Sequence, residues 1–154
     1  MPPDQRKALW EHRENLPMYE SESLFITAVR DREPELVKVL MHLGAHKSCG
    51  SDEAFAIGYA AFMGDPALCR LLIKEGISAN CRDIEMGENP LHELARNLIH
   101  TEHMRTCLEI LISNGADING ISKQGKTPLD IALRHQQQPT IELLCEYGAI
   151  RGTH

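Results

Sequence analysis

Three histidines are the side chains best placed to do chemistry in this sequence. His100 and His103 are three residues apart, a spacing that puts both imidazoles on one face of a helix, and His92 lies shortly before them. Neutral imidazoles are common ligands of zinc. His100 and His103, however, belong to the polar segment 97–103, which is more typical of a solvated loop. We therefore predict no metal site.

Cysteine chemistry has equally little support. Three of the thiols, Cys69, Cys107 and Cys145, fall within apolar helical stretches, so we predict that they are buried and reduced. Cys81 has no obvious base near it that would make it a nucleophile. A disulfide framework or a structural zinc site is disfavoured because the cysteines are odd in number and lack a C-x-x-C pair; they are Cys49, Cys69, Cys81, Cys107 and Cys145.

The common catalytic motifs are absent. The chain contains no G-x-S-x-G, no phosphate-binding P-loop, no G-x-G-x-x-G and no H-E-x-x-H. We predict that the protein is not an enzyme and needs no cofactor. A metal- or thiol-dependent enzyme is kept as a remote alternative.

The elements that position these residues repeat along the chain. The apolar stretches LVKVLMHLG, LCRLLIKEG, CLEILISNG and TIELLCEYG each close on a glycine, at Gly44, Gly76, Gly115 and Gly148. A glycine can adopt the left-handed conformation that ends a helix. The glycines are 32, 39 and 33 residues apart. Such a period predicts one supersecondary unit that is copied and stacked.

The start of a unit is clearest in the segments NPLHELA, from Asn89, and GKTPLDIA, from Gly125. Asn89 and Thr127 are good N-caps, and the proline that follows each fits the first helical position. Leu91 and Leu129 then lie on the inward apolar face. With the later segments NGADING and YGA, these motifs closely resemble the ankyrin repeat family.

The resemblance covers about residues 21–150. It implies an all-α solenoid of stacked antiparallel helix pairs with projecting finger loops. We expect an N-terminal extension at 1–20 and repeats within 21–154, at about 21–51, 52–84, 85–122 and 123–150. In the extension, Leu9, Trp10 and Leu16 could form a helix that covers unit one, or the segment could be an arm that is mobile or binds a partner. We expect the last residues, from Ile150, to be a frayed end.

Two units and one loop depart from the family pattern. In unit one we expect Ser23 to cap the first helix. In unit two, Phe55-Ala-Ile57 stands where T-P-L would be, and capping by Ser51 to Glu53 would start the helix a turn earlier. The insertion at 97–103 is either a tolerated longer loop or a protrusion that contacts a partner.

Charge and composition narrow the class of partner. The net charge of −6 argues against nucleic acid or an anionic membrane as the main partner and suits a protein with a basic patch. No apolar run approaches the length of a membrane span, and the first residues lack a signal-peptide core. We expect a cytoplasmic protein that is monomeric when free.

In proteins similar to this one, the partner is met by the fingers and by the outward positions of the first helices. Tyr59, Phe62 and Met63 are the most prominent candidates, because large apolar groups facing solvent are typical anchors. The acidic finger 83–88 could pair with a basic partner. The full predicted surface is Tyr59, Phe62, Met63, Asp83, Ile84, Glu85, Met86, Glu88, Glu93, Arg96, Asn97, Lys126, Arg134 and His135. Its outward positions in the end units also include Arg30 and Ile131.

We therefore expect a non-catalytic module that binds another protein stoichiometrically. A chain with little beyond one binding surface resembles inhibitors and immunity proteins, which act by occupying a partner's surface. An adaptor that links two proteins is the alternative. It would need a second recognition surface.

Overall fold

A computed structural model describes residues 18–47, 52–97 and 102–153 of the chain, with side chains from Leu24 onward. These residues form helices and connecting loops with no strand among them, which confirms the predicted all-α fold. The α-helices follow one another in four pairs. They are α2 (Met18–Arg30) with α3 (Pro34–His42), α4 (Asp52–Met63) with α5 (Pro66–Lys74), α6 (Pro90–Arg96) with α7 (Glu102–Ser113), and α8 (Pro128–Arg134) with α9 (Gln138–Glu146).

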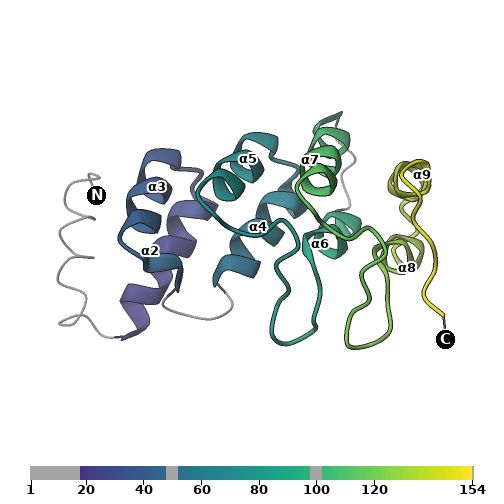
Figure 1. The fold of residues 1–154 in the computed structure, drawn as a ribbon, viewed down its shortest axis with the longest axis horizontal. Helices are drawn as coiled ribbons and strands as arrows, with labels where there is room; N and C mark the ends of the chain where they lie inside the picture. Colours follow the sequence, from purple (N-terminus) through teal and green to yellow (C-terminus); the bar gives the residue numbers. More distant parts are fainter. Residues whose placement is uncertain (1–17, 48–51, 98–101, 154) are drawn as a thin grey trace.

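The pairs stand side by side in two layers. Figure 1 shows α3, α5, α7 and α9 along the top and α2, α4, α6 and α8 beneath them. The loops after α5 and α7 extend away from the helices on the lower side. We call residues 83–88 finger one and residues 121–126 finger two. None of the described helices is long and apolar enough to cross a membrane.

The helix starts follow the predicted local chemistry. The Asn89 side chain caps α6 by accepting the backbone N–H groups of Leu91 and His92. Thr127 caps α8 in the same way through Asp130 N–H, at 3.3 Å. All four glycines that close the repeated stretches have positive φ, from 78° at Gly44 to 105° at Gly76. They end the second helices as the sequence predicts.

The core runs without interruption along the stack. In the lower layer Ile57 of α4, Leu91 and Leu94 of α6 and Leu129 of α8 are all buried. Leucines of the upper layer pack against them from α3, α5, α7 and α9. Each unit buries its apolar face against its neighbours, so a single unit would not be stable alone.

The first described helix begins earlier than the sequence predicts. α2 begins at Met18, so it extends into the predicted extension. Ser23 therefore lies inside the helix, and its predicted role as the N-cap is wrong. Residues 1–17, with Leu9, Trp10 and Leu16, lie outside the described residues, as does Ser51.

The prediction of a frayed C-terminal end is also wrong for the residues up to Gly152. Ile150 N–H donates to Asn119 Oδ1 at 2.8 Å, and Ile150 O accepts from the Thr127 hydroxyl at 2.9 Å. Gly152 N–H donates to Asp130 Oδ2 at 2.9 Å. A Cβ on Gly152 would lie 2.5 Å from Gly125 O, so only glycine fits this close approach. The tail thus packs against finger two and the start of α8.

Candidate protein-binding surface

A groove of about 470 Å³ runs between α4 and finger one. Its α4 wall consists of Ala54, Phe55, Gly58, Tyr59 and Phe62, and its opposite wall is formed by finger one and the start of α6. The second wall carries several carboxylates and one large apolar side chain. Its lining residues are Asp83, Ile84, Glu85, Glu88, Asn89, Pro90 and Glu93.

The α4 wall is aromatic. Phe55 and Tyr59 are stacked, with ring centroids 6.0 Å apart and an interplanar angle of 13°. The Arg30 guanidinium lies 5.2 Å from the centroid of the Phe55 ring. Phe55 and Phe62 are each 38% exposed, which is unusual for phenylalanine. The wall therefore offers a partner apolar area that the fold itself leaves open.

Phe55 is not among the surface residues predicted from the sequence, because it was aligned with the first residue of the T-P-L motif. Because α4 begins at Asp52, the residue falls a full turn into the helix. Phe55, Tyr59 and Phe62 are then spaced i, i+4, i+7 and share one face. That spacing was visible in the sequence.

Asp83 holds the shape of finger one. Its carboxylate accepts the backbone N–H of Met86 at 2.6 Å and of Glu88 at 2.8 Å. Gly87 turns the chain with a positive φ of 67°. Ile84 projects at the tip and is 60% exposed. Finger one is thus a fixed loop that presents an apolar side chain beside the acidic Glu85.

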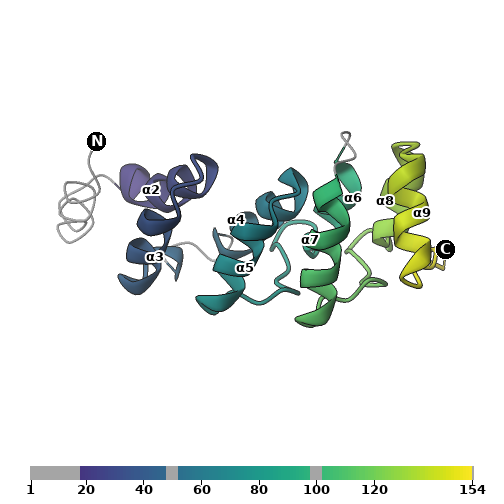
Figure 2. The same cartoon turned by 90° about the horizontal axis from the view of Figure 1, so that it is seen from above.

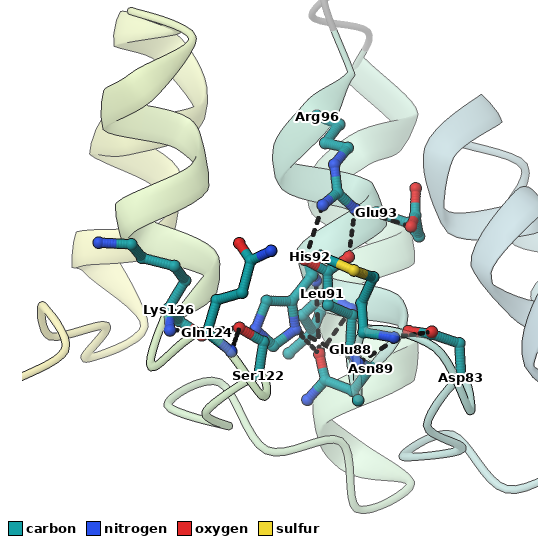
Figure 3. Close-up of polar contacts among 12 residues, drawn as sticks. Asp83, Glu88, Asn89, Leu91, His92, Glu93, Arg96, Ser122, Gln124 and Lys126 are labelled. Atoms are coloured by element: carbon teal, nitrogen blue, oxygen red, sulfur yellow. Dashed lines mark hydrogen bonds and ion pairs between the residues drawn. The ribbon is translucent and has the colours of Figure 1, made fainter.

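A half-buried charge cluster lies behind the groove. Arg96 binds Glu88 through Nη2 at 2.7 Å and Nη1 at 2.5 Å, and its Nη1 also binds Glu93 at 2.7 Å (Figure 3). The hydrogen bond to Glu88 raises the pKa of Arg96. Burial raises the pKa of Glu93 above its ordinary range, although Arg96 opposes this shift. Two carboxylates thus share one cation in this cluster.

Gly58 makes room for this cluster. A Cβ at that position would lie 3.2 Å from Cγ of Glu93. The glycine therefore lets α6 carry a long acidic side chain into the groove next to α4.

The two fingers are joined through backbone atoms. Lys123 N–H donates to Met86 O at 2.8 Å, and Lys123 Nζ donates to Ile84 O at 2.5 Å. Arg82 Nη1 donates to the carbonyls of Gly87 and Ile121, each at 2.9 Å. Finger one is therefore supported from the side by the next unit, which restricts its movement.

His92 joins unit three to unit four. Its Nε2–H donates to Lys126 O at 3.0 Å, and its Nδ1 accepts Asn89 N–H at 3.1 Å. The Lys126 carbonyl can only accept, so Nε2 carries a proton, and Nδ1 also lies 2.8 Å from Asn89 Oδ1. Burial lowers the pKa of His92 below its ordinary value.

We expect the protein to lose stability as the pH falls from 7.5 to 5.5. The pKa of His92 is lowered on folding, so the unfolded chain binds more protons below about pH 6.5 and is favoured there. His46, whose pKa is also lowered by burial, acts in the same direction. Urea unfolding at several pH values measures the slope. A His92→Gln variant should be less stable at pH 7.5 yet show a shallower slope, and equal slopes would show that His92 does not titrate in this range.

The other predicted surface residues are placed unequally. Met63 is exposed at the end of α4, outside the groove. Asn97 is buried and donates to Phe62 O at 2.6 Å, which ties α6 to α4. A separate hollow of about 460 Å³ at unit four includes Lys126 and Arg134. The exposed His135 follows α8, whereas Ile131 is buried, contrary to its predicted outward position.

Two further sequence predictions concern metals and thiols. His100 and the insertion residues 98–101 lie outside the described residues, and His103 is exposed. In the part of the chain that is described, no three His, Cys, Asp or Glu residues are grouped so as to hold a metal ion. Cys69 and Cys107 are buried as predicted, but Cys145 is exposed, because it lies on the outer face of α9.

Comparison with known proteins agrees with the row of helix pairs. Residues 24–119 and 57–151 match the family model described as ankyrin repeats (3 copies). Protein PhlB of Serratia liquefaciens is 32% identical over 126 residues, which are 81% of this chain and 53% of that protein. The potassium channel KOR2 of Oryza sativa subsp. japonica is 35% identical over 77 residues, 50% of this chain and 10% of the channel.

The nuclear factor NF-kappa-B p105 subunit of Gallus gallus is 28% identical over 114 residues, 73% of this chain and 11% of that subunit. The chain thus spans about half the length of PhlB and about a tenth of the other two proteins.

Proposed function

The chain belongs to the ankyrin-repeat family, a family of protein-interaction modules, and we propose on that basis that it works by stoichiometric binding of another protein with no catalytic step. The observation that carries this proposal is the groove between α4 and finger one. It combines exposed aromatic rings, an apolar finger tip and a net negative wall. An apolar anchor ringed by polar groups is the usual energetic layout of a protein interface.

The groove favours a particular partner chemistry. Phe55, Tyr59 and Phe62 would receive an apolar side chain, and Glu85 and Glu93 would face a neighbouring lysine or arginine. We therefore propose a partner that presents a basic patch around an apolar residue. An arginine suits best, because its guanidinium can stack on an aromatic ring and bind a carboxylate.

We propose that binding inhibits the partner by occupying its surface, in the manner of an inhibitor or immunity protein. The adaptor alternative requires a second recognition surface. Most of the N-terminal extension and the centre of the insertion, from which such a surface was expected, lie outside the described residues.

The proposed compartment is the cytoplasm, and the free protein is proposed to be a monomer. Cys69, Cys81, Cys107 and Cys145 are all free thiols. Free thiols in this number suit a reducing compartment.

Affinity capture tests the proposal. Tagged wild-type protein and a tagged Tyr59→Ala/Phe62→Ala variant would be exposed to the same lysate of the source cells. We expect one protein to co-purify with the wild type in a one-to-one ratio and to be lost with the variant. A partner retained equally by both would refute the groove as its site, and two partners bound at once would favour the adaptor.

We expect Glu85→Lys to slow association with the captured partner several-fold at low salt. Glu85 is exposed on finger one, so its charge steers a basic partner toward the groove without holding the fold together. Stopped-flow or surface-plasmon measurements over a salt series would give the rate constants. The difference should shrink at high salt. Glu142→Lys, the same charge change on exposed α9, should leave the rate unchanged. An equal slowing by both variants would point to net charge as the cause.

A further inference from the structure

A second groove, of about 360 Å³, lies in the other layer of the stack, between α3 and α5. Figure 2 shows these two helices on the same face of the molecule, with the first helices of their units behind them. We call this the α3–α5 groove. Its lining residues are Arg32, Pro34, Lys38, Asp65, Ala67, Leu68, Arg70, Leu71 and Lys74.

The α3–α5 groove is basic, although the chain as a whole is acidic. Arg70 and Lys74 lie one turn apart on α5, and both are exposed. Neither forms an ion pair with any residue in the described ranges. Lys38 binds Glu35 at 2.9 Å, but the Glu35 side chain is 81% exposed and easily exchanged for another carboxylate. At physiological salt, charges act over about 8 Å, so these cations attract an anion despite the net charge of the chain.

The arrangement suits a peptide better than a small anion. The cations come from both sides of the groove, since Arg32 and Lys38 lie before and on α3 and Arg70 and Lys74 lie on α5. The apolar Leu68 and Leu71 line the groove with them. The N-terminus of α5, where an isolated anion would bind, is already occupied by the Asp65 carboxylate, which accepts Leu68 N–H at 3.1 Å. A second negative charge at that point would be repelled.

The backbone conformation at position 32 does not favour an arginine. Arg32 adopts a φ of 54°, a conformation that favours glycine. At the corresponding turn of unit two, Gly64 has a φ of 62°. In unit one this turn carries an arginine, which lies 3.4 Å from Asp65 and lines the groove.

From this charge and shape we propose that the α3–α5 groove binds an acidic segment of a protein partner, with carboxylates on Arg70 and Lys74 and an apolar side chain on Leu68 and Leu71. This site is separate from the groove between α4 and finger one and does not depend on it. If both are occupied together, the protein has the second surface that an adaptor requires.

A fluorescent peptide rich in glutamate and leucine tests this proposal, with a matched peptide that carries glutamine in place of glutamate. We expect the glutamate peptide alone to bind, with an affinity that falls as salt is raised. Arg70→Glu/Lys74→Glu should weaken binding about ten-fold or more. Arg32→Gly should also weaken binding. The thermal midpoint of the protein should not fall, because glycine adopts a φ of 54° without strain.

Three controls decide the location and the ligand. Tyr59→Ala/Phe62→Ala should leave peptide binding unchanged, which separates this site from the proposed function. Lys126→Glu/Arg134→Glu should also leave it unchanged, and a loss there would move the site to the hollow at unit four and overturn the proposal. Equal binding of the glutamine peptide would overturn it as well. The proposal would also be overturned if inorganic tripolyphosphate or anionic vesicles displaced the fluorescent peptide more strongly than unlabelled peptide does.

Discussion

Replacing Leu91 with alanine is expected to lower the free energy of unfolding by about 2–5 kcal/mol. Leu91 is 0% exposed on α6, the lower helix of an internal unit. Truncation would leave a cavity between neighbouring units, and packed helices on both sides would prevent its collapse. Equilibrium unfolding in urea, followed by circular dichroism, measures the loss.

Two matched leucines sharpen this prediction. Leu129→Ala, at the equivalent position of unit four, should cost a similar amount or somewhat less, because Leu129 is 6% exposed whereas Leu91 is 0% exposed. Leu133→Ala should cost less than about 1 kcal/mol, since Leu133 is 37% exposed. An unchanged midpoint for Leu91→Ala would show that the assigned inward face is wrong.

Removing the aromatic wall of the groove is expected to have the largest effect on binding. Tyr59→Ala or Phe62→Ala should each weaken the complex with the captured partner by about 2 kcal/mol or more, which is roughly 30-fold. Both rings line the groove, and Phe62 is exposed in the free protein, so a partner would bury area that the fold leaves in solvent. Isothermal titration calorimetry gives the affinity.

The control for this prediction is an exposed apolar residue outside the groove. Ile121 on finger two is 54% exposed and is not part of the lining, so Ile121→Ala should leave the affinity unchanged. The urea midpoint should move little for Phe62→Ala. If the Tyr59 and Phe62 variants bind normally but unfold easily, those rings serve the core and the proposed anchor is wrong.

The helix pairs were predictable because their signals are local. A cap, a proline at the first helical position and a terminal glycine each act within one turn. The sequence therefore predicted α6 and α8 from Asn89 and Thr127, and the structure confirms both.

The remaining features depend on contacts that a single unit does not encode. Phe55 is exposed because it shares one face of α4 with Tyr59 and Phe62, while Ile57, Ala60 and Ala61 on the same helix are buried. Cys145 is exposed because its face of α9 meets no neighbour in the described part of the chain. Gly152 is ordered by Gly125 and Asp130, two positions far from it in the sequence. Part of the surface predicted for units two and three, including Tyr59, Phe62 and Ile84, lines one groove. Met63, Met86 and Arg96 do not line it, and Asn97 is turned inward.

The side chains that finger one presents can change without changing the shape of the loop. Its shape depends on the Asp83 carboxylate, on Gly87 and on the bonds that the backbone N–H and Nζ of Lys123 donate to main-chain carbonyls of the finger. The side chains at 84, 85 and 86 take no part in those bonds. These positions can therefore vary while the loop keeps its course. Substitutions at these three positions, in evolution or in a randomised library, can change which partner is recognised without changing the stability of the stack.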